Sequence, residues 1–133
     1  MTSSKINKRI LVVDDDNDIL EVIEEILTYE GFEVRSLGDI NNIFPEISSY
    51  SPDVIILDYI LKGINGGEIC HQIKVNPHTA KVPVILMSAY HRVFNSLGNY
   101  GCNAFIAKPF NLNDIVDHIH HLISSSQNVT HVR

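Results

Sequence analysis

The sequence has few cysteines and no long hydrophobic run, and each shortage excludes a class of protein. Only 2 of the 133 residues are cysteines. That is too few for a disulfide framework, and Cys70 and Cys102 lack the spacing of a metal site. No apolar run reaches the roughly 18 residues of a membrane-spanning helix, and the polar segment 1–9 lacks the apolar centre of a signal peptide. We therefore expect a cytoplasmic chain without a membrane partner, whose two thiols are buried or half-buried and reduced.

Positive charge is also scarce. Lysine and arginine together number 10, whereas aspartate and glutamate number 16, so the net charge is -6. An acidic balance argues against nonspecific binding to nucleic acid or to an anionic membrane surface. The length fits one domain, and the hydrophobic fraction of 44% is enough for a single packed core. Because no repeat or linker divides the chain, we expect a polar N-terminal tail (1–8), one domain (9–123) and a polar C-terminal tail (124–133).

Short apolar runs alternate with amphipathic segments and predict five strand–helix units. Apolar runs bounded by polar residues are typical of strands buried on both faces. The expected strands are 9–13, 32–36, 54–57, 83–87 and 104–107. The expected helices are 17–30, 39–50, 66–75, 91–97 and 112–123.

Individual residues predict where several helices begin or end. Asp16 and Asn111 are suited to cap the first and last helices, and Gly31 to stop the first. Pro45 lies inside the second helix, where proline removes a hydrogen bond, so this helix is expected to be irregular or to start late. The polar segment from Ser124 onward is expected to fray.

Strands that alternate with helices imply an α/β fold with a parallel sheet and helices on both faces. The expected architecture is a flavodoxin-like, doubly wound, five-stranded sheet of order 2-1-3-4-5. Such sheets bind ligands beyond the C-terminal ends of the strands, where the strand order reverses. In this order that point lies between the first and third strands, so residues far apart in the sequence meet there.

Carboxylates follow both of these strands. Asp14, Asp15 and Asp16 come directly after the apolar run 10–13, and Asp58 ends the run 54–57. Two like charges about 4 Å apart repel by roughly 4 kcal/mol at an effective dielectric of about 20. A pocket formed by Asp14, Asp15 and Asp58 is therefore costly unless it holds a cation.

The fourth and fifth strands add a hydroxyl and an amine at the same edge, from Ser88 and Lys108. A set of oxygen ligands suits Mg2+ far better than zinc or copper. A carboxylate beside Mg2+ and a lysine can act as a nucleophile toward phosphorus and form an acyl phosphate. Phosphoryl transfer needs mainly positioning and charge neutralisation, which Mg2+, Lys108 and Ser88 can supply.

Five motifs in this order resemble the receiver domain of two-component response regulators, over about residues 9–123. The motifs are Ile10-Leu11-Val12-Val13-Asp14-Asp15-Asp16, Pro52-Asp53-Val54-Ile55-Ile56-Leu57-Asp58, Gly63 with Gly66, Pro83-Val84-Ile85-Leu86-Met87-Ser88-Ala89 and Lys108-Pro109-Phe110. Each motif alone is weak, but their order and their places at the strand ends make a specific signal.

The resemblance implies a role for each matching residue. Asp58 is expected to accept the phosphoryl group, with Lys108 and Ser88 contacting the phosphoryl oxygens. Mg2+ is expected to bind Asp58, Asp15, Asp14 (directly or through water) and the backbone carbonyl of Ile60. The Lys108-Pro109 bond is expected to be cis. Asp16 is expected to cap a helix rather than bind metal.

The resemblance also implies a switch. Ser88 is expected to move toward the phosphoryl group and Phe105 to turn, which shifts the surface formed by the fourth helix, fifth strand and fifth helix. Receivers are switches rather than enzymes, and take phosphate from a histidine kinase or a phosphotransfer protein. No effector sequence follows Ile123, so the output is expected from a downstream protein or from an effector domain outside this sequence. We expect a monomer when the domain is unphosphorylated.

Four features depart from the family pattern. Lys62 stands where the family often has proline, and Phe105 has no hydroxyl, so the switch would work by packing alone. The segment between Ser88 and Lys108 is about two residues shorter than is usual. Ile60 and Tyr90 lie at positions that tune dephosphorylation in the family, and neither offers a carboxylate or amide to orient water. Slow self-dephosphorylation is therefore expected.

Two other functions compete with the phosphorylated switch. A Mg2+-dependent phosphohydrolase with an aspartate nucleophile usually needs a second acid two residues further on, where this chain has Ile60. A pseudo-receiver would dock a partner without being phosphorylated. The complete set of Asp14, Asp15, Asp58 and Lys108, with Ser88, argues against it.

Overall fold

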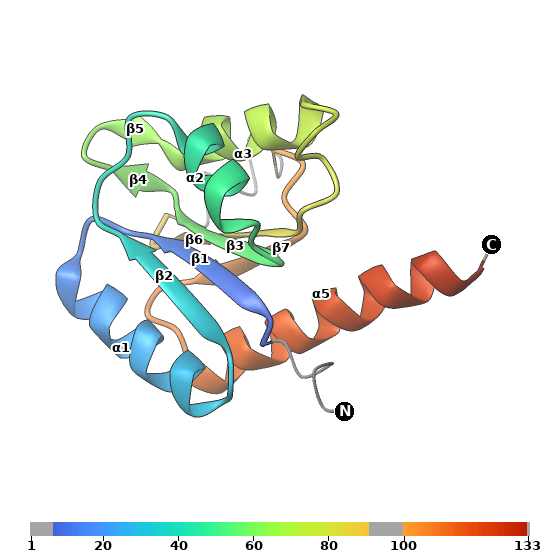
Figure 1. The fold of residues 1–133 in the computed structure, drawn as a ribbon. Coiled ribbons are helices and arrows are strands. Elements are labelled where there is room, and N and C mark those ends of the chain that lie inside the picture. Colours follow the sequence, from blue (N-terminus) through green and yellow to red (C-terminus); the bar gives the residue numbers. More distant parts are fainter. Residues whose placement is uncertain (1–6, 91–99, 133) are drawn as a thin grey trace.

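The five predicted strands form a single parallel sheet in a computed structural model that describes residues 7–90 and 100–132, with side chains to residue 125. The strand order is β2-β1-β3-β6-β7, which is the predicted order 2-1-3-4-5 (Figure 1). The strands are β1 Arg9–Val13, β2 Glu33–Leu37, β3 Val54–Asp58, β6 Val84–Ser88 and β7 Ala104–Ala107. In the three central strands almost every side chain is buried, because helices cover both faces of the sheet.

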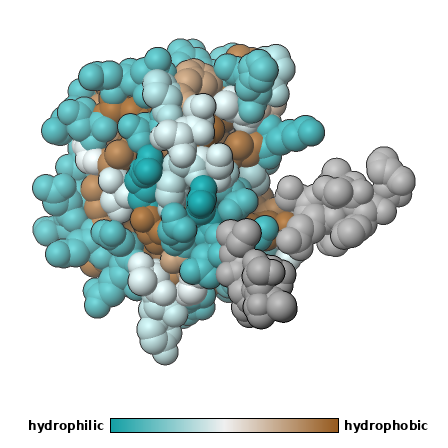
Figure 2. All heavy atoms as spheres, viewed as in Figure 1, coloured by the Kyte–Doolittle hydropathy of each residue, from teal (hydrophilic) through white to brown (hydrophobic). Residues whose placement is uncertain are grey.

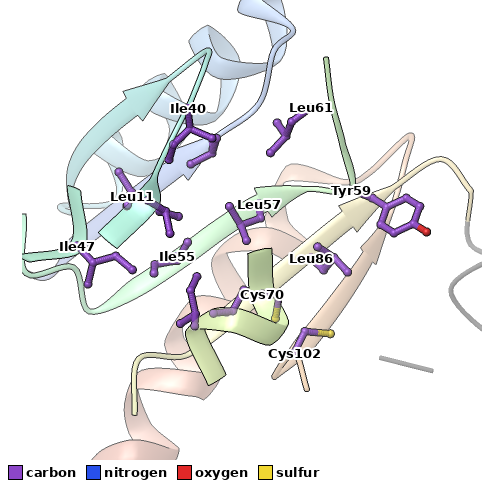
Figure 3. Packing of buried hydrophobic residues seen from close by; sticks show 14 of the residues in the cluster. Leu11, Ile40, Ile47, Ile55, Leu57, Tyr59, Leu61, Cys70, Leu86 and Cys102 are labelled. Atoms are coloured by element: carbon purple, nitrogen blue, oxygen red, sulfur yellow. The ribbon is translucent and has the colours of Figure 1, made fainter. Parts of the chain in front are cut away.

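Among the described residues, two helices lie on each face of the sheet. One face carries α1 (Asn17–Tyr29) and α5 (Leu112–Val132), and the other carries α2 (Ile43–Tyr50) and α3 (Gly66–Val75) (Figure 1). Side chains alternate between the two faces along each strand. The core is therefore divided into two apolar clusters, and Figure 3 shows the one under α2 and α3.

The outer surface is largely polar. On the face seen in Figure 2, hydrophilic residues cover most of the molecule and hydrophobic residues appear in smaller, separate areas. Cys70 and Cys102 are buried in the α2–α3 cluster as free thiols, as predicted, and burial raises the pKa of the Cys70 thiol to about 12. None of the helices that the structure describes is long and apolar enough to span a membrane.

The second helix starts late, as predicted from its proline. It begins at Ile43, so Pro45 lies in the first turn, where backbone N–H groups have no partner within the helix. The Asn42 side chain caps this turn by accepting a hydrogen bond from the backbone N–H of Phe44 (3.1 Å).

The structure differs from the sequence predictions in two places. The α5 helix continues to Val132 instead of ending near Ile123, because polar residues at the end of a helix do not by themselves stop it. The loop after β3 contains a small antiparallel hairpin, formed by β4 (Ile60–Leu61) and β5 (Ile64–Asn65). The helix predicted within 91–97 lies outside the described residues.

Candidate functional site

Three aspartates meet at the C-terminal edge of the sheet, as their positions after β1 and β3 predict. These strands are neighbours, with Val13 opposite Leu57, so Asp14 and Asp58 emerge side by side. Oxygen atoms of Asp14, Asp15 and Asp58 lie within 4.8 Å of one another. Asp14 is fully buried and Asp58 is only 6% exposed. The cluster is thus not an ordinary acidic surface, where water would screen the charges.

One amine lies between two of these carboxylates. The Lys108 Nζ atom is 2.9 Å from Asp14 Oδ2 and 2.7 Å from Asp58 Oδ1. Lys108 directly follows β7, and its backbone N–H donates to the Ser88 carbonyl (2.9 Å). The Lys108-Pro109 bond is cis, as expected. Lys108 reaches the aspartates because β7 runs parallel to β6 and β3, so that all three strands end at the same edge of the sheet.

The lysine does not fully compensate the negative charge. Burial raises the pKa of the Asp58 carboxyl, and repulsion from Asp14 and Asp15 acts in the same direction, against the hydrogen bond from Lys108. Burial alone would lower the pKa of the Lys108 amine, but its bonds to Asp58 and Asp14 outweigh burial and raise it. The pocket accordingly favours additional positive charge.

Backbone N–H groups orient two of the carboxylates. The amide of Asp16 donates to Asp14 Oδ1 (2.9 Å), and the amide of Lys62 donates to Asp15 Oδ2 (3.0 Å). The side chain of Asp16 points away from this cluster and caps α1, accepting from Asp18 and Ile19. Asp16 is thus a capping residue, as predicted.

The contact from Lys62 was not foreseen from the sequence. Lys62 and Gly63 occupy the turn of the β4–β5 hairpin with φ values of 49° and 83°. Two such residues are typical of a tight hairpin turn. Proline, which the family often has at this position, could adopt neither this φ nor this hydrogen bond. The lysine–glycine pair between Leu61 and Ile64 was the available signal for the hairpin.

The predicted switch residues lie on the two strands that follow β3 in the sheet, Ser88 on β6 and Phe105 on β7. Ser88 ends β6 and is buried, and its Oγ accepts a hydrogen bond from the Tyr90 backbone N–H (2.7 Å). Phe105 lies opposite Leu86 in the pairing of β6 with β7 and packs, half-buried, against the α2–α3 cluster. Ile60 begins β4, and its side chain is 44% exposed.

A glycine allows α3 to begin directly against the phosphoacceptor candidate. A Cβ atom on Gly66 would lie 2.0 Å from the backbone oxygen of Asp58. The Gly66 N–H donates to the Tyr59 carbonyl. The motif of Gly63 with Gly66 did not by itself predict that Gly66 touches Asp58.

The donor set fits a hard divalent cation. It consists of carboxylate oxygens only, with three formal negative charges against one lysine. Mg2+ and Ca2+ prefer such oxygen ligands, whereas zinc and copper prefer nitrogen and sulfur. Asp14, Asp15 and Asp58 are thus the residues that can hold a metal here.

Comparison with known proteins gives one consistent result. A family model described as response regulator receiver domain matches residues 10–120. The DNA-binding response regulator MtrA of Mycobacterium tuberculosis is 32% identical over 111 residues, which are 82% of this chain and 47% of the relative. The response regulator ArlR of Staphylococcus aureus is 31% identical over 113 residues, or 84% and 50%. The chain therefore spans about half the length of the curated relatives that it matches.

Solved structures agree with the sequence matches. A CheY-like response regulator receiver domain protein from Methanospirillum hungatei has a TM-score of 0.78 and 28% identity, covering 92% of this chain and 98% of its own. The response regulator TrrA from Thermotoga maritima, solved in complex with Mg2+-BeF, has a TM-score of 0.77 and 30% identity, covering 86% and 98%. This chain belongs to the family of response regulator receiver domains, the signalling switches of two-component systems.

Proposed function

We propose that this domain accepts a phosphoryl group on Asp58, with Mg2+, from a histidine kinase or a phosphotransfer protein. The observation that carries the proposal is the Lys108 amine, which bonds to Asp14 and Asp58 at once while Asp15 lies in the same cluster. Structural ion pairs do not need a third carboxylate in the same cluster, whereas a phosphoacceptor beside a metal does.

Each residue has a separate task in this transfer. Asp14, Asp15, Asp58 and the backbone carbonyl of Ile60 would hold Mg2+, which neutralises phosphoryl oxygens when bound. An Asp58 oxygen attacks phosphorus, and the bond from phosphorus to the donor breaks as the new P–O bond forms. Lys108 leaves its place between two carboxylates only to pair with a phosphoryl oxygen, so its charge stays compensated throughout.

The phosphoryl group then changes the balance between two conformations. The Ser88 hydroxyl, which accepts a bond from Tyr90 in this structure, donates to a phosphoryl oxygen instead. Phe105 repacks on the neighbouring strand, and the surface that includes β7 and α5 changes with it. The output passes to a downstream protein or to an effector domain outside this sequence. We propose a cytoplasmic location and a monomer before phosphorylation.

Intact mass measurement tests the proposal. The protein is incubated with Mg2+ and acetyl phosphate, a small acyl-phosphate donor. One phosphoryl group is expected on the wild type and none on Asp58→Ala. Steady release of phosphate with fast turnover would indicate a phosphohydrolase instead. Absence of an adduct on the wild type, with Mg2+ present in excess, would indicate a docking module that is not phosphorylated.

The phosphorylated form is expected to last for minutes or longer. Ile60 and Tyr90, each two residues beyond Asp58 or Ser88, are 44% and 58% exposed, and neither carries a carboxylate or amide to orient a water molecule for attack on the acyl phosphate. A carboxamide at position 60 could orient this water. Ile60→Asn is therefore expected to shorten the half-life about tenfold, which is less than a fully positioned catalytic group contributes to such reactions. The half-life is read from the loss of the mass adduct after the donor is removed. A wild-type half-life of seconds would contradict the prediction.

A further inference from the structure

Tyr59, the residue after Asp58, contacts a second tyrosine from a distant part of the chain. Its side chain is 7% exposed within the α2–α3 cluster (Figure 3). The hydroxyls of Tyr59 and Tyr100 are 3.4 Å apart, and the ring centroids are 6.1 Å apart with a 43° tilt. The bond to Tyr100, with burial, raises the pKa of the Tyr59 hydroxyl, while a hydrogen bond from the Asn65 side chain lowers it.

The position of Tyr59 determines the position of Asp58. Asp58 and Tyr59 share a peptide plane, and this plane is rigid. The Tyr59 N–H donates to the Met87 carbonyl (2.8 Å), and the Tyr59 carbonyl accepts from the Gly66 N–H (2.6 Å). The side chain is the remaining part of Tyr59 that needs a fixed place, and its contact with Tyr100 provides one.

Tyr100 has an unusual backbone that its side-chain contacts maintain. Its φ is 54°, in the left-handed region that a bulky residue rarely adopts, and Gly101 follows with a φ of 82°. Such strain persists only where the surroundings hold the residue. Here the ring lies against α3, where a Cβ atom on Gly67 would be 2.6 Å from it, and the hydroxyl meets Tyr59.

Tyr59 follows one strand and Tyr100 precedes another, and their side chains meet beside α3. Tyr59 follows β3 at the edge that carries the aspartates. Tyr100 precedes β7, and because β7 runs parallel to β6 and β3, its start lies at the other edge. Lys108, which binds Asp58, directly follows β7. Tyr100 thus lies in the turn before the strand that leads to the lysine at the phosphoacceptor.

We propose that Tyr59 and Tyr100 are positioning residues for the phosphorylation of Asp58. Their hydroxyl contact fixes the Asp58–Tyr59 peptide and links the turn before β7 to the state of the site. The inference rests on the proposed function of Asp58. The inference gives this pair the hydroxyl contact that connects the site with the β7 region. Phe105 cannot make such a contact because it has no hydroxyl.

Four single phenylalanine variants and one double variant test the kinetic part of the inference. Tyr59→Phe and Tyr100→Phe each remove one hydroxyl and keep the ring. Each is expected to lower the maximal rate of phosphorylation by acetyl phosphate about three- to tenfold, the factor that corresponds to one hydrogen bond. The donor concentration at half-maximal rate and the Mg2+ affinity should not change. The double variant should be no slower than the slower single variant. Tyr29→Phe on the surface of α1 and Tyr50→Phe in α2 are matched controls. Both are expected to be phosphorylated at the wild-type rate.

A spectroscopic measurement tests the link to the site. The chain has 5 tyrosines, so 13C labels at the hydroxyl-bearing ring carbon give few resonances, which the phenylalanine variants assign. Addition of Mg2+ and beryllofluoride, a phosphoryl mimic, is expected to shift the resonances of Tyr59 and Tyr100 but not that of Tyr29. A merely structural pair would show neither this shift nor the selective loss of maximal rate.

The outcomes separate this inference from the proposed function. If the wild type gains no phosphoryl group in the mass experiment, the function of Asp58 is wrong and the pair has nothing to position. If the wild type is phosphorylated while both phenylalanine variants react at its rate, the inference alone is overturned. Unmoved Tyr59 and Tyr100 resonances in a protein with bound beryllofluoride would overturn it as well.

Discussion

Gly66→Ala is expected to destabilise the fold by about 3 kcal/mol or more and to prevent phosphorylation of Asp58. The new Cβ atom would lie 2.0 Å from the Asp58 carbonyl oxygen and 3.0 Å from its carbonyl carbon. Both atoms belong to the backbone of a buried central strand, so no side-chain rotation relieves the clash. Either α3 or the C-terminal end of β3 must move, and both carry the geometry of the site.

Two other glycines provide a graded control for this prediction. A Cβ atom on Gly38 would meet Asn17 Oδ1 at 3.5 Å, an ordinary contact, so Gly38→Ala should change stability by only about 0.5 kcal/mol. The loss of stability in Gly67→Ala should lie between those of Gly66→Ala and Gly38→Ala. The atoms that its Cβ would contact belong to the Tyr100 ring, and this side chain can turn. Urea unfolding gives the three values, and the mass adduct reports the site. If Gly66→Ala were as stable as Gly38→Ala, the close approach of α3 to Asp58 would be wrong.

The sheet could be predicted from the sequence because its signals are local. Each central strand is a short apolar run with a polar end, and all five predicted strands lie within about a residue of their observed limits. The aspartate cluster followed from topology alone, since neighbouring parallel strands must deliver their C-terminal residues to the same edge. Pro45 likewise predicted the late start of α2.

Other features depend on contacts that no local pattern encodes. The β4–β5 hairpin has two residues in each strand, too few for an alternating pattern, and its Lys62 amide reaches a carboxylate 47 positions away. The contact of Tyr59 with Tyr100 spans 41 positions and depends on how α3 packs. The length of α5 was also missed, because the prediction treated a polar composition as a helix end.

The roles of the site residues depended on more than local chemistry. A lysine before a proline is an ordinary loop sequence, and only its context at the end of the fifth predicted strand gave Lys108 a place at the edge that carries Asp58. The structure now shows the two atoms 2.7 Å apart. Ser88 is buried at the end of β6, next to the strand that carries Asp58. The substitution of Lys108 tests this arrangement most directly.

Lys108→Met is expected to weaken the fold in the absence of Mg2+ by about 3 kcal/mol, because it leaves Asp14 and Asp58 buried without a cation. Methionine keeps most of the length and the apolar stem of lysine, so the loss reports the charge. The same variant is expected to be phosphorylated about 10²- to 10³-fold more slowly, since a donor to the transferred oxygens is gone. Chemical unfolding and the rate of the mass adduct measure the two effects.

The effect of Lys108→Met on metal binding has the opposite sign. In the wild type, the amine occupies the carboxylates that Mg2+ would bind, at 2.9 Å and 2.7 Å. The repulsion between an amine and a divalent ion a few ångströms away costs several kcal/mol at an effective dielectric of about 20. Because the variant lacks this repulsion, its Mg2+ affinity should be about tenfold higher or more. Addition of Mg2+ should therefore restore more stability to the variant than to the wild type.

Lys74→Met separates this charge effect from the general loss of a half-buried lysine. The Lys74 amine donates to the backbone carbonyls of Ala80 (3.0 Å) and Val82 (2.8 Å), and it contacts no aspartate of the cluster. Its removal should cost about 1–3 kcal/mol through two unpaired carbonyls and leave the Mg2+ affinity unchanged. A lower stability in Lys108→Met without a higher Mg2+ affinity would mean that Lys108 only packs against the sheet. The ion and the amine would then not share the carboxylates, and the phosphoacceptor site as we propose it would be wrong.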